Sequence, residues 1–215
     1  MAASSPKPDW SVALGHLRKV DPVMKGLIAK VGPCRLEPRR DYFVMLANAI
    51  VSQQISTKVA EVLFNRFKDQ FPRRKPTPEL TTRFLAGEEA LVRACGLSRQ
   101  KHSYLIDLSL HFTTGKIPVR RFARMSDDEV IESLTQVKGI GRWTAEMFLI
   151  FVLNRPDVFP VDDLGIQEAY KKFYKLPERP TPKKLLPLGE AWRPWRTVAT
   201  YYLWRALEDK PPVKV

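Results

Sequence analysis

Residues 137–151 read VKGIGRWTAEMFLIF, and this stretch decides the fold. Gly139 and Gly141 interrupt what would otherwise be one amphipathic helical pattern. Glycine has no Cβ, so it permits backbone angles that other residues avoid and lets another segment approach closely. We therefore expect one helix to end just before the glycines and a second to begin at about Arg142. Ile140, between the glycines, should anchor the turn in the core.

This turn also has the sequence of an anion site. The first N–H groups of the following helix lack partners within it, and the helix dipole makes that end positive. A phosphate group suits such a site. Lys138 stands beside the turn and adds positive charge. The alternative is a plain helical hairpin whose glycines only make the turn, because two glycines between helices are weak evidence by themselves.

Almost every other segment has the 3.6-residue period of a helix, so we expect an all-α fold. Residues 157–161, DVFPV, are the best strand candidate, but the segment is short and contains a proline. Residues with capping side chains precede the predicted helices, and they are Asp21, Ser56, Ser98, Ser126 and Thr181. Two faces are expected to be buried: Phe43, Leu46, Ala47, Ile50 and Val51 in one helix, and Val59, Val62, Leu63 and Phe67 in the next.

The net charge and the cysteine count limit the kinds of partner and metal site that this protein can have. The chain has 36 Lys and Arg against 23 Asp and Glu, a net charge of +13, which favours a polyanionic partner such as nucleic acid. No segment reads as a basic amphipathic helix with a broad apolar face, so a membrane partner is not expected. The only cysteines, Cys34 and Cys95, exclude a zinc finger and a four-cysteine iron–sulfur site. We expect no metal bound by side chains and no cofactor.

Two adjacent carboxylates, Asp162 and Asp163, follow the hairpin by about twenty residues, within FPVDDLGIQEAY. An aspartate at the head of a helix caps it and complements its dipole. Helix capping is therefore the simple interpretation of this pair when the segment is read alone.

Together, however, these segments resemble the helix-hairpin-helix DNA glycosylases, in which a hairpin, a Gly/Pro loop and an essential aspartate follow one another. The matching elements here are LTQVKGIGRWTAEMFLIF, the loop ending in FPV, and Asp163. Asp163 is preferred to Asp162 because Ile166 matches the family's apolar position three residues after the aspartate. The resemblance covers most of the chain, from YFVMLANAIVSQQIS to PWRTVATYYLW.

One position selects the branch of the family. Members that also cut the strand carry a Schiff-base lysine two residues after the last hairpin glycine, and this chain has Trp143 there. Without an amine at that position, imine chemistry has no nucleophile. The pattern GIGRWTA resembles the alkylation-repair branch, 3-methyladenine DNA glycosylase II. The resemblance therefore implies a monofunctional enzyme that flips alkylated purines out of double-stranded DNA and hydrolyses their glycosidic bond.

The resemblance also implies roles for particular residues. Ionised Asp163 would be catalytic. Aromatic faces attract a cationic base by roughly 0.5–2 kcal/mol, and the base pocket would contain Trp143, Trp204, Met147 and Leu164. DNA contacts would come from Lys138, Gly139, Ile140, Gly141, Arg142 and Thr144 in the hairpin. Gln54, or else Gln53, would fill the gap in the duplex, with Leu97 or Arg99 as the wedge. The family's hairpin can also bind a monovalent cation through backbone carbonyls.

The implied architecture is a single glycosylase unit over residues 1–215, made of two helical lobes with a cleft between them. One lobe would span about 41–155 and contain the hairpin at 137–141; the other would combine 1–40 with 156–215. We expect a monomer without an N-terminal β domain, cytoplasmic in a bacterium or nuclear in a eukaryote. The alternatives are a glycosylase for oxidised, deaminated or mismatched bases, and a noncatalytic helix-hairpin-helix DNA-binding protein.

Overall fold

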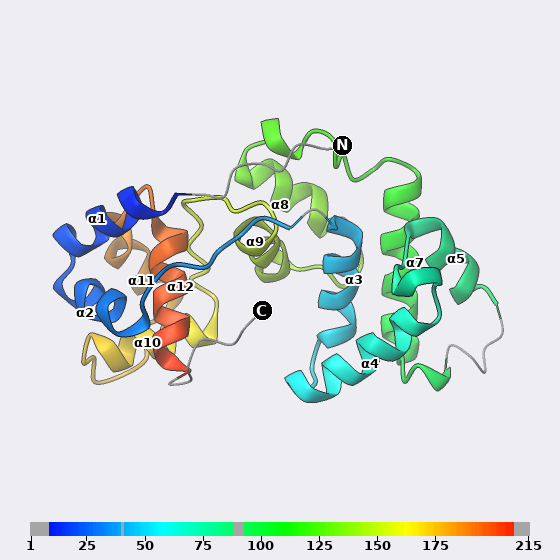
Figure 1. The fold of residues 1–215 in the computed structure, drawn as a ribbon, viewed down its shortest axis with the longest axis horizontal. Helices are drawn as coiled ribbons and strands as arrows, with labels where there is room; N and C mark the ends of the chain where they lie inside the picture. Colours follow the sequence, from blue (N-terminus) through cyan, green and yellow to red (C-terminus); the bar gives the residue numbers. More distant parts are fainter. Residues whose placement is uncertain (1–8, 40, 88–92, 209–215) are drawn as a thin grey trace. The chain divides into compact units, whose positions relative to one another are not determined.

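The structure is a computed structural model that describes residues 9–39, 41–87 and 93–208. In these residues the chain forms eleven α-helices and three short 3₁₀ helices, with no strand (Figure 1). The predicted all-α class is therefore confirmed. Residues 157–161, the best strand candidate, run through a turn and irregular backbone. No helix among the described residues is long and apolar enough to cross a membrane.

The chain divides into two compact units, one made of residues 39–148 and the other of residues 1–38 with 149–215. We call the first the hairpin unit and the second the aspartate unit, after Gly139 and Asp163. The second boundary lies inside the helix α9 (Arg142–Phe151). The sequence predicted this boundary at about residue 155, seven residues later.

The hairpin unit is built around α7 (Arg99–Thr113), which contacts both α3 (Tyr42–Ser52) and α5 (Pro78–Leu85). Helix α3 also contacts α4 (Thr57–Asp69), as Figure 1 shows. The remaining elements of the unit are η1 (Pro72–Arg74), η2 (Phe122–Arg124), α8 (Asp127–Thr135) and the first part of α9.

The buried faces of α3 and α4 differ in how well the sequence predicted them. All five residues expected to be buried in α3 are buried, from Phe43 to Val51. In α4 the prediction is confirmed for Phe67, while Leu63 is half-buried; it was wrong for Val59 and Val62, which are 46% and 44% exposed. The buried side consists of Ala60, Phe64 and Phe67. The Phe67 ring contacts Phe71 and Phe84 edge-on, and this aromatic cluster, rather than the valines, sets the rotation of the helix.

The aspartate unit is built around α12 (Arg196–Leu207), which contacts α2 (Pro22–Val31) and α10 (Leu164–Phe173). Helix α1 (Ser11–Val20) packs on α2 (Figure 1). Two short elements, α11 (Pro182–Leu188) and η3 (Glu190–Trp192), lie between α10 and α12 in the chain. The core of the unit includes Trp192 and Tyr202, both fully buried.

The predicted helix starts are confirmed at each capping residue. Asp21, Ser56, Ser98, Ser126 and Thr181 all accept hydrogen bonds from backbone N–H groups in the first turn of their helices, and Ser126 forms a capping box with Glu129. Helices α1 and α5 were not predicted individually. The segment EEALVRACG, residues 88–96, also has helical period, but it falls largely on residues 88–92, which lie outside the described residues.

Asp21 also connects distant parts of the aspartate unit. Its Oδ1 caps α2 by accepting from the N–H groups of Val23 and Met24 at 2.8 and 3.0 Å. Its Oδ2 accepts from the Tyr174 hydroxyl at 2.5 Å and from the Trp192 indole N–H at 2.8 Å. One carboxylate therefore joins the beginning of the chain to segments more than 150 residues later. Burial, followed by the hydrogen bond to Asp21, raises the pKa of Tyr174 above its ordinary value.

We predict that this tyrosine makes the protein sensitive to alkali. Because the folded-state pKa of Tyr174 is raised, its contribution is complete below the unfolded tyrosine pKa of about 10 and is lost as pH rises above it. The Tyr174→Phe variant should lose about 1.5–3 kcal/mol at pH 7, the worth of a hydrogen bond to a charged group. Its stability should then fall less steeply above pH 10. Urea unfolding of both proteins across this pH range would check the prediction, and parallel pH profiles would contradict it.

Candidate functional site

The hairpin turn lies between α8 and α9 as predicted. Helix α8 ends at Thr135, α9 begins at Arg142, and Ile140 is buried between them with 3% of its surface exposed. Gly139 adopts a φ of +84°, in the left-handed region that favours glycine. Gly141 has no positive φ, and a Cβ there would meet no heavy atom within 4 Å. The conformational requirement expected of both glycines therefore applies to Gly139 alone.

Three side chains from other elements of the unit hold this turn. The ring of Tyr104, from α7, lies so close to Gly139 that a Cβ there would be 2.1 Å from its Cδ2 atom. The Gln53 side-chain amide donates to the Gly139 carbonyl at 2.7 Å. The Lys138 backbone N–H donates to Asp107 Oδ2 at 2.8 Å. Tyr104 and Asp107 were missed in the sequence, because no local pattern connects α7 to a turn about 31 residues away.

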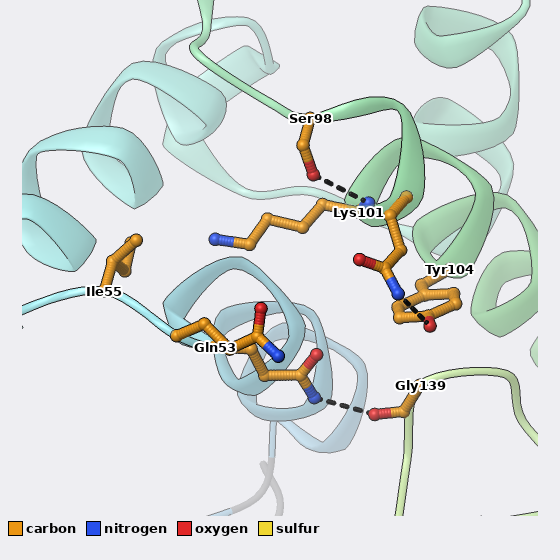
Figure 2. A pocket seen from close by; sticks show the side chains of 8 residues that line it. Gln53, Ile55, Ser98, Lys101, Tyr104 and Gly139 are labelled. Carbon is orange, nitrogen blue, oxygen red and sulfur yellow. Dashed lines mark hydrogen bonds between the residues drawn. The ribbon is translucent and has the colours of Figure 1, made fainter.

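A pocket of about 430 Å³ opens beside the turn, entirely within the hairpin unit. Figure 2 shows Gln53 and Tyr104 flanking Gly139, with Ser98 and Lys101 opposite. The structure thus brings together three segments that the sequence assigned to DNA contact: the hairpin, the SQQIS loop and the turn before α7. The pocket is lined by Gln53, Gln54, Ile55, Ser98, Gln100, Lys101, Tyr104 and Gly139.

Within this pocket the structure separates the alternatives that the sequence left open. Gln53 is held on the Gly139 carbonyl, whereas Gln54 is exposed, with a φ of +59°. The geometry therefore favours Gln54 as the residue that projects outward. Leu97 is 8% exposed, so its role as a wedge is not supported, because its side chain would have to leave the core. Arg99 is exposed in the first turn of α7 and is the better candidate.

The side chains of the hairpin differ in what they offer a ligand. Lys138 is exposed, and Arg142 has 60% of its side chain exposed while its Nε lies 3.1 Å from Glu146 Oε1. Thr144 is 7% exposed, so its side chain is not displayed for DNA contact as the sequence suggested. The Ile140 N–H donates to the Val137 carbonyl inside the turn. Positive charge at this turn therefore comes from Lys138 and Arg142.

In the aspartate unit, Asp163 is the N-cap of α10 and is 9% exposed. Its Oδ1 accepts from the Ile166 backbone N–H at 2.8 Å, so the capping interpretation is correct. The same oxygen accepts from the Trp204 indole N–H at 2.9 Å. Capping and a second, long-range contact therefore coexist on one carboxylate. Asp162, by contrast, is exposed.

Of the other predicted pocket residues, two lie in the aspartate unit and two lie on α9. Trp204 is half-buried on α12 and stacks on Phe151, with ring centroids 5.6 Å apart. Leu164, next to Asp163, is 62% exposed. On α9, in the hairpin unit, Trp143 is 48% exposed and Met147 is half-buried. Neither tryptophan is therefore an ordinary core residue.

Comparison with known proteins identifies the family. Residues 47–194 match the family described as HhH-GPD superfamily base excision DNA repair protein. This match covers more than half of the chain and includes both the hairpin and Asp163. The chain belongs to the HhH-GPD superfamily.

Several HhH-GPD relatives share a name. DNA-3-methyladenine glycosylase 1 of Schizosaccharomyces pombe is 42% identical over 199 residues, covering 88% of this chain and 84% of the relative. A solved structure of the S. pombe 3-methyladenine DNA glycosylase in complex with abasic DNA matches with a TM-score of 0.82 at 38% identity, covering 95% of this chain and all of that one. A DNA-3-methyladenine glycosidase from Bacillus halodurans matches with a TM-score of 0.81 at 31% identity, covering 97% and 92%.

The HhH-GPD hairpin of this chain was also expected to offer backbone carbonyls to a monovalent cation. The carbonyls of Val137, Gly139 and Gly141 each accept a hydrogen bond, from Ile140 N–H, the Gln53 amide and Ala145 N–H. Each of these oxygens keeps a second lone pair that could ligate a cation, so the cation site stays a prediction. Among the described residues there is also no group of three or more His, Cys, Asp or Glu side chains that could hold a metal ion.

The loop before the HhH-GPD aspartate is attached to the start of α12. Arg196 is bonded to Asp157 through Nε and Oδ1 at 2.7 Å and through Nη2 and Oδ2 at 3.0 Å. Buried Thr197 donates to the Arg155 carbonyl at 2.6 Å and accepts from the Val158 N–H at 2.9 Å. The helix that carries Trp204 therefore also fixes the loop that leads to Asp163.

We predict that Thr197→Val destabilises the protein by about 1–3 kcal/mol, because it leaves the buried Val158 N–H without its acceptor. Thr200→Val is the matched control: it lies one turn later, is equally buried, and its hydroxyl has no hydrogen-bond partner among the described residues. That variant should be neutral or slightly stabilising. Urea unfolding of the two variants would check this, and equal losses would show that the loop contact is unimportant.

Proposed function

We propose that this protein is a monofunctional DNA glycosylase that removes alkylated purines, such as 3-methyladenine and 7-methylguanine, from double-stranded DNA. The observation that carries the proposal is the buried Asp163, oriented by two N–H donors at the head of α10. Its place in an HhH-GPD chain whose relatives are named 3-methyladenine glycosylases supports the substrate class.

The chemistry needs little more than a fixed negative charge. A purine methylated at N3 or N7 is cationic, so it departs with the electron pair of the C1′–N bond and becomes neutral. The sugar then develops positive charge, which ionised Asp163 stabilises. Water adds to C1′ and loses a proton, leaving an abasic site and a free base. No covalent enzyme intermediate is required, in agreement with a tryptophan at position 143 in place of lysine.

The remaining residues would select and hold the substrate. Trp143, with nearly half of its surface exposed, offers an aromatic face to a cationic base. In the hairpin unit, Lys138 and Arg142 would contact phosphates, and contacts of this kind hold DNA without reading its sequence. Gln54 and Arg99 would fill the space left by the flipped nucleotide. Weakly paired alkylated bases flip at lower cost, which adds selectivity. We expect the protein to act as a monomer.

The test is direct measurement of free bases. DNA treated with a methylating agent should release N3-methyladenine and N7-methylguanine when incubated with the protein, as detected by mass spectrometry. Duplexes containing 8-oxoguanine or a mismatch serve as the comparison. Preferential release from those duplexes would favour a glycosylase for oxidised or mismatched bases, and no release at all would favour a noncatalytic DNA-binding protein. Borohydride should trap no covalent complex, and efficient trapping would contradict the monofunctional assignment.

A further inference from the structure

The contact between Trp204 and Asp163 suggests a role for the indole beyond that of a pocket wall. The indole N–H donates to Asp163 Oδ1 at 2.9 Å. Ile166 also donates to this oxygen, but it belongs to the same helix start as Asp163 and is an ordinary cap contact. Trp204 comes from a different helix, 41 residues later, so its bond fixes the carboxylate relative to the rest of the unit.

The orientation of the indole is itself restricted. Its ring stacks on Phe151 at an interplanar angle of 22°. Its helix, α12, is attached at its first turn to the loop before Asp163 through Arg196 and Thr197. The donor is therefore held by packing on one face and by the helix that carries it. A hydrogen bond from a fixed donor restricts an acceptor more than one from a mobile side chain.

Gly165 provides an independent observation: a side chain at this position would crowd the contact between Asp163 and Trp204. A Cβ at this position would lie 3.0 Å from Asp163 Oδ1 and 3.4 Å from both Cδ1 and Nε1 of Trp204. Its backbone φ is not in the left-handed region, so the turn itself does not demand glycine. The missing side chain leaves room for the carboxylate and the indole to meet.

We propose that Trp204 is a positioning residue that fixes the Asp163 carboxylate through its indole N–H, separately from any contact of its ring face with the base. The inference rests on the proposed function, because it assigns Trp204 a part in the same reaction. If this is correct, removing the indole N–H should have little effect on the affinity for DNA in general. It should specifically weaken the preference for DNA that carries a positive charge at the C1′ position.

Two abasic duplexes separate these effects, one with a cationic pyrrolidine at the abasic position and one with a neutral tetrahydrofuran. The ratio of their affinities measures how well the carboxylate faces the charge. The parent protein should prefer the pyrrolidine duplex, and Asp163→Asn should abolish the preference. Trp204→Phe keeps an aromatic ring but loses the donor, and should lower the ratio about fivefold to tenfold, as expected for one charge-assisted hydrogen bond. Its affinity for the tetrahydrofuran duplex should stay within about twofold of the parent.

Two further variants serve as a matched control and as an independent disturbance of the same contact. Trp195→Phe makes the same chemical change at the N-cap of α12 and should leave the ratio unchanged. Gly165→Ala keeps both Asp163 and Trp204 but places a Cβ 3.0 Å from Asp163 Oδ1 and 3.4 Å from the indole Nε1, which crowds both groups. It should therefore lower the ratio even if Trp204→Phe fails to fold. In the Asp163→Asn background, Trp204→Phe should have no further effect on the ratio.

The possible failures are distinguishable. If Trp204→Phe weakens both duplexes equally, Trp204 acts only as a wall and the inference is overturned while the proposed function stands. An unchanged ratio in folded Gly165→Ala would overturn it as well. If the parent protein neither prefers the pyrrolidine duplex nor releases methylated purines, the proposed function itself fails.

Discussion

The Asp163→Asn variant should fold as the parent protein does and release methylated purines at least about a hundredfold more slowly, the usual cost of losing a main electrostatic stabiliser. The side chains have the same shape, and the Asn carbonyl can accept the same bonds from the Ile166 N–H and the Trp204 indole that Asp163 Oδ1 accepts. Asparagine is also about as good an N-cap as aspartate. The substitution therefore removes charge and leaves the local geometry in place.

Two measurements check this prediction: the thermal midpoint and the single-turnover rate of N7-methylguanine release. The midpoint should change by no more than a few degrees, and affinity for undamaged duplex should be retained. Asp162→Asn is the matched control, because Asp162 is the adjacent carboxylate but is exposed. It should release bases at close to the parent rate. Full activity in the Asp163 variant, or equal losses in both, would remove Asp163 from its catalytic role.

Gly139→Ala should have the second large effect, a destabilisation of about 2–5 kcal/mol together with weaker DNA binding. An alanine at φ +84° is strained by about 1–2 kcal/mol. Its Cβ would also be 2.1 Å from the Tyr104 ring, and overpacking of this kind costs about 1–3 kcal/mol more. The ring, the turn or both must move, and the turn carries Lys138, whose backbone N–H is bonded to Asp107.

Gly115→Ala separates the two causes. Gly115 has a similar φ of +71°, but a Cβ there would meet no heavy atom within 4 Å, so it should show the strain without the clash. Adding Tyr104→Ala to the Gly139→Ala variant should recover part of the lost DNA affinity, because the space is vacated. Urea unfolding and duplex binding measured by fluorescence anisotropy would check both. If Gly115→Ala and Gly139→Ala behave alike, the contact with Tyr104 does not position the turn.

Features that depend on neighbouring residues could be read from the sequence. Each capping side chain accepts a hydrogen bond from a backbone N–H two or three residues away. The helix starts at Asp21, Ser126 and Asp163 could therefore be predicted from the local sequence. The glycine turn is similarly local. The five buried residues of α3 could be recognised because its apolar positions form one face with few competing ones.

Features that depend on distant partners could not be read. Helix α4 has apolar residues on two sides, and only the cluster of Phe71 and Phe84 decides that Phe67 and Phe64 face inward while Val59 does not. Leu97 looks like a surface wedge in its loop but is packed in the core. The contacts of Gly139 with Tyr104 and of Asp163 with Trp204 join residues 35 and 41 positions apart. No local sequence pattern predicts contacts between residues so far apart in the chain.

The order in which the protein is synthesised has a consequence for its two units. The hairpin unit is one continuous stretch, residues 39–148, whereas the aspartate unit needs residues 1–38 together with 149–215. In that unit Asp21 accepts hydrogen bonds from the side chains of Tyr174 and Trp192, and the Gly32 carbonyl accepts one from the Tyr202 hydroxyl. As the chain emerges from the ribosome, Asp21 and Gly32 must therefore wait until residues 174–202 have been synthesised. We expect the central stretch to fold first, in reverse of the usual N-to-C order.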